Sequence, residues 1–166
     1  MNLYAAPGYK LSMLEIQKLA YFLQESGENL KLRFVKAQFG PYADNLNHVL
    51  QRLEGHYIRG YGDRNRDAEI YLLPEVTKEA EDFLSQLNDG STDKRLQDTK
   101  QIIEGYETPY GLELLATTDW IIKHHPDSRD NVKIAIDHFK AWNERKKNVF
   151  KDTHIEMAWS HLTAID

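Results

Sequence analysis

Apolar residues recur at helical spacing along most of this chain, most clearly between residues 12 and 26. Ser12 and Glu15 have the spacing of a capping box, and Gly27 supplies a helix end, so the pattern predicts a helix over residues 12–26. Its apolar stripe consists of Ile16, Leu19, Ala20 and Leu23, with Tyr21 and Phe22 lying off it. A helix that is apolar nearly all round is usually covered on more than one side, so we expect this helix to be central.

A second helix is predicted over residues 41–54. Pro41 follows Gly40 and suits the first helical position, where its missing N–H costs nothing, and Gly55 ends the pattern. The predicted apolar face consists of Tyr42, Leu46, Val49, Leu50 and Leu53, and the opposite stripe carries Asn45, His48 and Arg52. That polar stripe is either a solvated face or a contact surface for a partner.

A β-hairpin is predicted from residues 57–61 and 68–73, joined by the polar residues 62–67. Period-two alternation places Tyr57, Arg59 and Tyr61 on one face, with Ile58 on the other. Tyrosine and arginine are enriched in protein contacts, and the same residues stack on single-stranded bases. The purely structural alternative is a cross-strand aromatic pair with Tyr71 that stabilises the hairpin.

The remaining chain is predicted to be helical. An amphipathic helix is expected over residues 76–87, and the polar run 88–93 is the best internal boundary. Thr108 is expected to cap a later helix, and Thr153 with Glu156 has the spacing of a capping box for the last one.

The predicted fold class is mainly α, a helical domain with one inserted β-hairpin. After a lead-in over residues 1–10, a winged-helix-like first lobe would span residues 11–87, with its hairpin at about 57–73. A C-terminal helical lobe over residues 93–166 would pack against the first.

Composition and charge narrow the class of protein. The 166 residues suit one globular domain, there is no cysteine, and no apolar run approaches the roughly 20 residues of a membrane span. With no secretory signal pattern either, we expect a soluble cytoplasmic protein that does not contact membranes. The formal charge of −5 disfavours direct binding to nucleic acid and is compatible with a basic protein partner.

No motif for catalysis is found in the sequence. It has no glycine-rich nucleotide loop, no zinc-protease HExxH, no cysteine nucleophile and no GxSxG elbow. His124, His125 and Asp127 could be read as metal ligands, but adjacent histidines point to different sides of a helix, and Pro126 marks a helix end. We therefore expect no catalytic residue, no cofactor and no metal site.

Three segments in order, LEIQKLAYFLQ, GPYADNL and HYIRGYGDR, resemble the C-terminal domain of DarG-type antitoxins, which is related to the Panacea and SocA-like antitoxin domains. The similarity is densest over residues 7–87. It implies the toxin-neutralising domain of a type II toxin–antitoxin system, whose partner is a DarT-type toxin that uses NAD to ADP-ribosylate single-stranded DNA. It also implies that this chain is not an enzyme, because the ADP-ribosyl glycohydrolase macrodomain that DarG-type proteins carry ahead of this region is absent from these residues.

The expected mechanism is steric inhibition, in which the acidic chain occupies the toxin's DNA site as a surrogate for DNA. The resemblance does not single out contact residues, so they come from the polar stripe and the hairpin face: Tyr42, Asn45, His48, Arg52, Tyr57, Arg59, Tyr61 and Arg64. The alternative function is a winged-helix nucleic-acid-binding regulator, for which Arg59, Arg64 and Arg66 would form the basic cluster.

Overall fold

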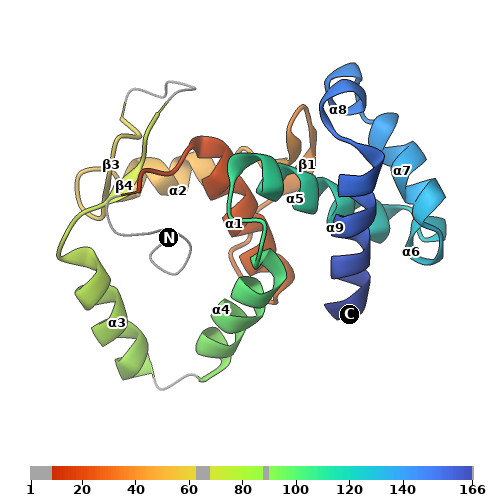
Figure 1. Cartoon of the computed structure of the whole chain (residues 1–166). Helices are drawn as coiled ribbons and strands as arrows, with labels where there is room; N and C mark the ends of the chain where they lie inside the picture. Colours follow the sequence, from red (N-terminus) through yellow and green to blue (C-terminus); the bar gives the residue numbers. More distant parts are fainter. Residues whose placement is uncertain (1–8, 63–67, 88–89, 166) are drawn as a thin grey trace.

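The chain is mainly helical, as predicted. The computed structural model describes residues 9–62, 68–87 and 90–165, and Figure 1 shows their arrangement. The helices in these residues are α1 (Met13–Glu25), α2 (Leu46–Leu53), α3 (Val76–Leu87), α4 (Gly90–Ile103), α5 (Pro109–His124), α6 (Asp127–Asp130), α7 (Val132–Lys140), α8 (Glu144–Val149) and α9 (Asp152–Ile165). The strands are β1 (Phe34–Ala37), β2 (Gly40–Ala43), β3 (Ile58–Arg59) and β4 (Tyr71–Leu72), which pair as two antiparallel hairpins, β1 with β2 and β3 with β4.

Helix α1 begins and ends as its local sequence predicts. The Ser12 hydroxyl accepts a hydrogen bond from the Glu15 N–H, and the Glu15 carboxylate accepts one from the Ser12 N–H at 2.7 Å. Beyond the last turn Gly27 has a φ of +96°, a left-handed conformation that glycine adopts without steric cost. The prediction of a capping box and a glycine stop is confirmed.

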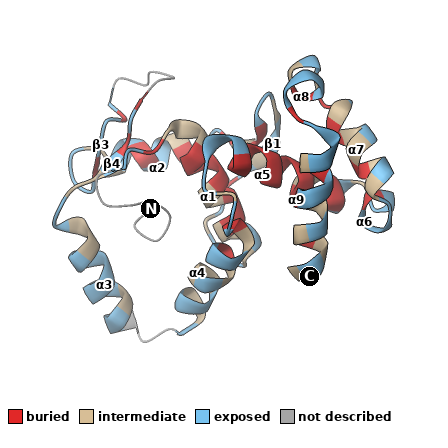
Figure 2. Ribbon diagram, viewed as in Figure 1, coloured by how far each residue is buried: buried red, intermediate tan, exposed pale blue. Residues whose placement is uncertain are grey.

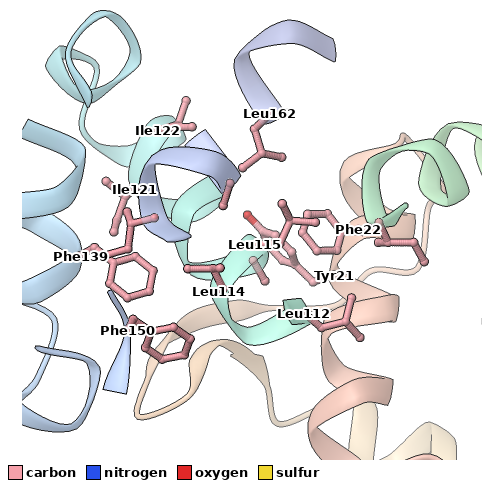
Figure 3. Close-up of a cluster of buried hydrophobic side chains, with 14 of the residues drawn as sticks. Tyr21, Phe22, Leu112, Leu114, Leu115, Ile121, Ile122, Phe139, Phe150 and Leu162 are labelled. Atoms are coloured by element: carbon pink, nitrogen blue, oxygen red, sulfur yellow. The ribbon is translucent and has the colours of Figure 1, made fainter. Parts of the chain in front are cut away.

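Two hydrophobic clusters form the core, and α1 contributes side chains to both. The smaller cluster joins α1 and α2 to the β3–β4 hairpin. The larger one surrounds α5, which packs against α1, α7 and α9 (Figure 3). Tyr21 and Phe22 of α1, each only 1% exposed, belong to this larger cluster. The central position expected for α1 is therefore confirmed, because opposite sides of the helix bury against different parts of the chain.

The start of the second helix differs from the prediction. Pro41 lies in strand β2 rather than at a helix N-terminus, and α2 begins five residues later at Leu46. Gly40 has a φ of +97° and turns the chain back so that β2 pairs with β1. Side chains of α1 then bind the β2 backbone, which satisfies carbonyl and N–H groups that a helix would otherwise pair internally. The mainly helical fold therefore carries a second small hairpin, β1–β2, beside the predicted one that contains β3 and β4.

Further differences from the predicted elements are local. Helix α4 begins at Gly90, inside the predicted boundary 88–93, of which residues 88–89 lie outside the described part of the chain. Helix α9 begins at Asp152, so Thr153 lies in its first turn rather than at the cap. The Thr108 cap is confirmed, because its hydroxyl accepts a hydrogen bond from the Gly111 N–H at 2.9 Å. Among the described residues, no helix has both the length and the apolar character that a membrane span requires.

Candidate functional site: partner-binding surfaces

Helix α2 and strand β3 present an exposed polar and aromatic face. His48 and Arg52 of α2 are exposed, and so are Tyr57 and Arg59 beside and within β3 (Figure 2). The hairpin register places Arg59 opposite Tyr71, so Tyr57 is not the directly opposed partner of that tyrosine. We call these four residues, His48, Arg52, Tyr57 and Arg59, the α2–β3 face. Tyr42 is half-buried nearby, and its hydroxyl accepts a hydrogen bond from Asn47 Nδ2 at 2.7 Å.

Tyr61 does not lie on the exposed hairpin face. The side chain is only 4% exposed, and its hydroxyl donates to the Asn47 carbonyl at 3.2 Å. The alternation of faces is interrupted at Gly60, which has a φ of +99°. A Cβ at Gly60 would lie 2.0 Å from the Glu69 carbonyl oxygen, so the two chain segments can approach only because this residue is glycine. The expected exposure of Tyr61 on the hairpin face is therefore not found, and its role in a partner contact stays a prediction without support from its burial.

Asn45 is engaged within the chain. Its side-chain oxygen accepts from the Arg33 N–H at 3.0 Å, and its Nδ2 donates to the Lys31 carbonyl at 3.0 Å. These bonds connect the start of α2 to the segment that leads into β1, which gives Asn45 a structural role. Arg64 lies outside the described residues, as does Arg66 of the alternative basic cluster.

A buried charged cluster joins α1, α5 and α8. Glu113 of α5 is 2% exposed and pairs with Arg145 through both carboxylate oxygens and with Lys146 Nζ at 2.8 Å. Lys146 also donates to the Thr117 hydroxyl at 2.9 Å. Lys18 of α1, 2% exposed, donates to the Pro41 carbonyl at 2.6 Å. Two buried amines and one guanidinium are thus grouped with a single carboxylate.

Burial lowers the proton affinity of both amines in this cluster. Burial and, to a lesser extent, the nearby charge of Lys146 lower the pKa of Lys18 to about 7, against a weaker opposing effect of Glu113. Burial lowers the pKa of Lys146 to about 8, although its contacts with Glu113 favour the charged form. Both amines therefore lose their protons at a lower pH than an exposed lysine does.

A groove that shares Arg145 with this cluster lies between the β1–β2 turn and the start of α8. It has a volume of about 640 Å³ and is lined by Lys36, Ala37, Gln38, Trp142, Asn143, Glu144 and Arg145. The Trp142 indole N–H donates to the Ala37 carbonyl at 2.8 Å, and Asn143 Nδ2 donates to the Gln38 carbonyl at 3.0 Å. Lys36 Nζ lies 4.5 Å from the centre of a Trp142 ring. Its charged lining consists of Lys36, Arg145 and the carboxylate of Glu144, and Arg145 is paired with Glu113. No pattern in the sequence indicates this groove, because its two walls are about a hundred residues apart in the chain.

The histidines expected to lie at a helix end do not form a metal site in the described structure. His125 is the C-terminal cap residue of α5, and its ring stacks on His138 with centroids 3.9 Å apart. His124 stacks on Trp120 of the same helix. Among the described residues, no group of three or more side chains of the ligand-forming types could hold a metal ion.

The fold and its surfaces define a mainly helical domain with several candidate contact faces. No family model matches the chain. It is similar to a protein of Thermus aquaticus named DNA ADP-ribosyl glycohydrolase, with 49% identity over 161 residues, which are 97% of this chain and 43% of that protein. Proteins of Mycobacterium tuberculosis and Mycobacterium bovis with the same name are each 34% identical over 159 residues, which cover 92% of this chain and 44% of theirs. The chain thus spans less than half the length of these relatives.

These comparisons correct one prediction from the sequence. The chain was expected not to be an enzyme, and the relatives that match nearly all of it bear the name of a hydrolase. That expectation rested on the absence of known catalytic motifs and on the absence of a macrodomain from these residues, and the name of the relatives overturns it.

Proposed function

We propose that this chain is the toxin-neutralising region of a DarG-type DNA ADP-ribosyl glycohydrolase in a type II toxin–antitoxin system. The observation that carries the proposal is the 49% identity to a protein of that name over 97% of the chain. An enzyme named for removing ADP-ribose from DNA belongs with a toxin that adds this group. The proposed partner is accordingly a DarT-type DNA ADP-ribosyltransferase, and the proposed location of both proteins is the cytoplasm.

The proposed mechanism is steric inhibition of the toxin's single-stranded DNA site. A toxin that binds DNA needs a basic groove, and a chain of net charge −5 is attracted to such a groove over long range. The α2–β3 face supplies the residue types found at protein contacts, because Tyr57 is 40% exposed and lies beside the exposed Arg59. We assign toxin contact to this face together with the half-buried Tyr42.

The proposal is tested by isothermal titration of the chain against a catalytically inactive DarT-type toxin from the same operon. Repeating the titration with saturating single-stranded DNA tests the mechanism. Tight binding that DNA abolishes supports occupation of the DNA site, whereas equal binding with and without DNA contradicts that mechanism and retains an antitoxin role. No binding to the toxin would contradict the proposal, and salt-dependent affinity for duplex DNA would then favour the winged-helix regulator.

The contact face is tested with truncations to alanine, which remove side-chain contacts without adding the negative charge that a basic groove would attract. Arg52→Ala and Arg59→Ala should each weaken toxin binding, by about tenfold if the arginine lies near the centre of the contact. The matched control is Lys133→Ala on α7, an exposed residue outside the α2–β3 face, which removes the same charge and should leave the affinity unchanged. If all three variants bind like the unmodified chain, the contact lies elsewhere.

A further inference from the structure

We propose that α3 is a docking helix whose apolar side binds the basic surface of the toxin. The inference rests on the proposed function, because it takes the same partner, and it assigns a contact that the sequence did not predict. The evidence comes from the packing of α3, the exposure of Phe83 and the charges that flank it.

Helix α3 is set apart from the two hydrophobic clusters. Figure 1 shows it at the side of the molecule, joined by the chain to β4 and α4. None of its described side chains belongs to either core cluster, and it packs extensively against no other described element. Phe83 is 59% exposed, and Val76 and Leu84 are only half-buried. Figure 2 shows the described residues of α3 in the colours of exposed and intermediate residues, with none of the buried colour. A large aromatic side chain at the centre of an amphipathic helix is thus left in contact with water.

This exposure is unusual for a short amphipathic helix. Isolated helices of about 12–15 residues or fewer are marginal in water, because most of their stability in proteins comes from burying the apolar side. Helix α3 has 12 residues and has its apolar positions at helical spacing, at Val76, Ala80, Phe83 and Leu84. A partner that covers the apolar side would therefore stabilise α3. Binding of such a partner would also order the helix.

The charges around the apolar side indicate which partner covers it. Glu75, Glu79, Glu81 and Asp82 are all exposed, and Lys78 is the one basic residue of α3. An apolar patch bordered by carboxylates is complementary to an apolar pocket bordered by lysine or arginine. The same carboxylates repel nucleic acid, an anionic membrane surface and the α3 helix of a second copy. The surface of a DNA-binding protein has the required positive charge, so we assign the toxin as the occupant.

The first experiment compares Phe83→Ala with a matched control, Met157→Ala. Met157 is 65% exposed on α9, so both variants remove an exposed apolar side chain from a helix. Titration against the catalytically inactive toxin should show an affinity loss of about tenfold or more for Phe83→Ala, as expected for a central interface residue, and no loss for Met157→Ala. Equal affinity of Phe83→Ala and the unmodified chain would overturn the inference while leaving the proposed function in place.

The second experiment tests the flanking charges. The double variant Glu79→Gln, Asp82→Gln should associate with the toxin more slowly at low salt, and the difference should shrink as salt is added. An association rate that is the same as that of the unmodified chain at low salt would contradict the role of these carboxylates. Circular dichroism should show an increase in helical signal when the unmodified chain binds toxin, beyond the sum of the separate proteins.

Thermal unfolding of the free chain separates docking from internal packing. Because Phe83 contacts little in the free chain, Phe83→Ala should leave its midpoint within about one degree of the unmodified value. A fall of several degrees would show that the chain itself covers Phe83, and this would overturn the inference. Failure of the unmodified chain to bind the toxin would overturn both this inference and the proposed function.

Discussion

The side-chain amide of Gln17 binds both backbone groups of Ala43. Gln17 Nε2 donates to the Ala43 carbonyl at 3.0 Å, and Gln17 Oε1 accepts from the Ala43 N–H at 3.0 Å. The neighbouring Lys18 binds the Pro41 carbonyl at 2.6 Å. Gln17 and Lys18 belong to the segment LEIQKLAYFLQ, and Pro41 and Ala43 belong to the segment GPYADNL. These two segments, which carry the family resemblance, therefore bind each other in the structure. These residues attach the β1–β2 hairpin to α1, and their role is in the fold.

Gln17→Leu should strongly destabilise the chain. Leucine has a similar size, but it leaves a buried N–H and a buried carbonyl of Ala43 without their partner, and each such group costs about 1–3 kcal/mol. We expect the free energy of unfolding, measured with urea, to fall by at least about 2 kcal/mol. The control Gln101→Leu, at an exposed position of α4, should change it by less than about 0.5 kcal/mol. Equal stability of both variants would contradict the role assigned to Gln17.

Glu113→Gln should also destabilise the fold. The substitution keeps the shape of the side chain but removes the negative charge that faces Arg145 and Lys146. Removing one partner of a buried ion pair costs about 3–5 kcal/mol, because the remaining charge is left uncompensated. Urea unfolding should show a loss of this size. Glu156→Gln, at an exposed position of α9, is the matched control and should be close to neutral.

Stability should rise with pH above neutral because of Lys18. Its pKa is lowered to about 7 in the folded chain, against the usual 10.5 that applies when unfolded. Between these values the unfolded chain binds a proton that the folded chain has released, so the free energy of unfolding increases with pH. Below pH 7 the Lys18 amine is charged in both the folded and the unfolded chain, so the folded chain is destabilised by the whole cost of burying that charge. At most, one such group contributes about 1.4 kcal/mol per pH unit.

The variant Lys18→Met tests the source of this dependence. Between pH 7 and 8 it should show a smaller rise in the free energy of unfolding than the unmodified chain. Above pH 8 a rise should remain, because the pKa of Lys146 is lowered to about 8. Lys100→Met, at an exposed position of α4, should retain the full dependence. An unchanged slope between pH 7 and 8 in Lys18→Met would show that another group is responsible.

Gly40→Ala should lower the free energy of unfolding more than the same substitution at other glycines with a positive φ. Gly40 has a φ of +97°, and a Cβ there would lie 2.8 Å from the Thr117 hydroxyl oxygen. Gly55 and Gly105 have similar angles, with no atom within 4 Å of a Cβ. Alanine at either of these should cost about 1–2 kcal/mol for the backbone conformation alone. Gly40→Ala should add about 1–3 kcal/mol for the close contact, as thermal or urea unfolding would measure.

Local signals in the sequence determined much of the secondary structure. The ends of α1 follow from Ser12, Glu15 and Gly27, and the start of α5 follows from Thr108, because capping involves residues only a few positions apart. The amphipathic pattern of α3 likewise predicted its helix. Such features depend on neighbours in the chain, so they can be predicted without knowing the tertiary structure.

Only the tertiary structure determined the strand conformation of Pro41 and the burial of Tyr61. Both features depart from what the local sequence pattern predicts. Pro41 is compatible with a helix start, but Lys18, more than twenty residues earlier, binds its carbonyl within a strand. Tyr61 turns inward because Gly60 lets the backbone approach Glu69. The candidate surfaces depend on similar long-range contacts, since the groove and the Glu113 cluster join residues from distant parts of the chain. Local propensity is weak compared with the cost of an unpaired buried group, so these long-range contacts determined the outcome.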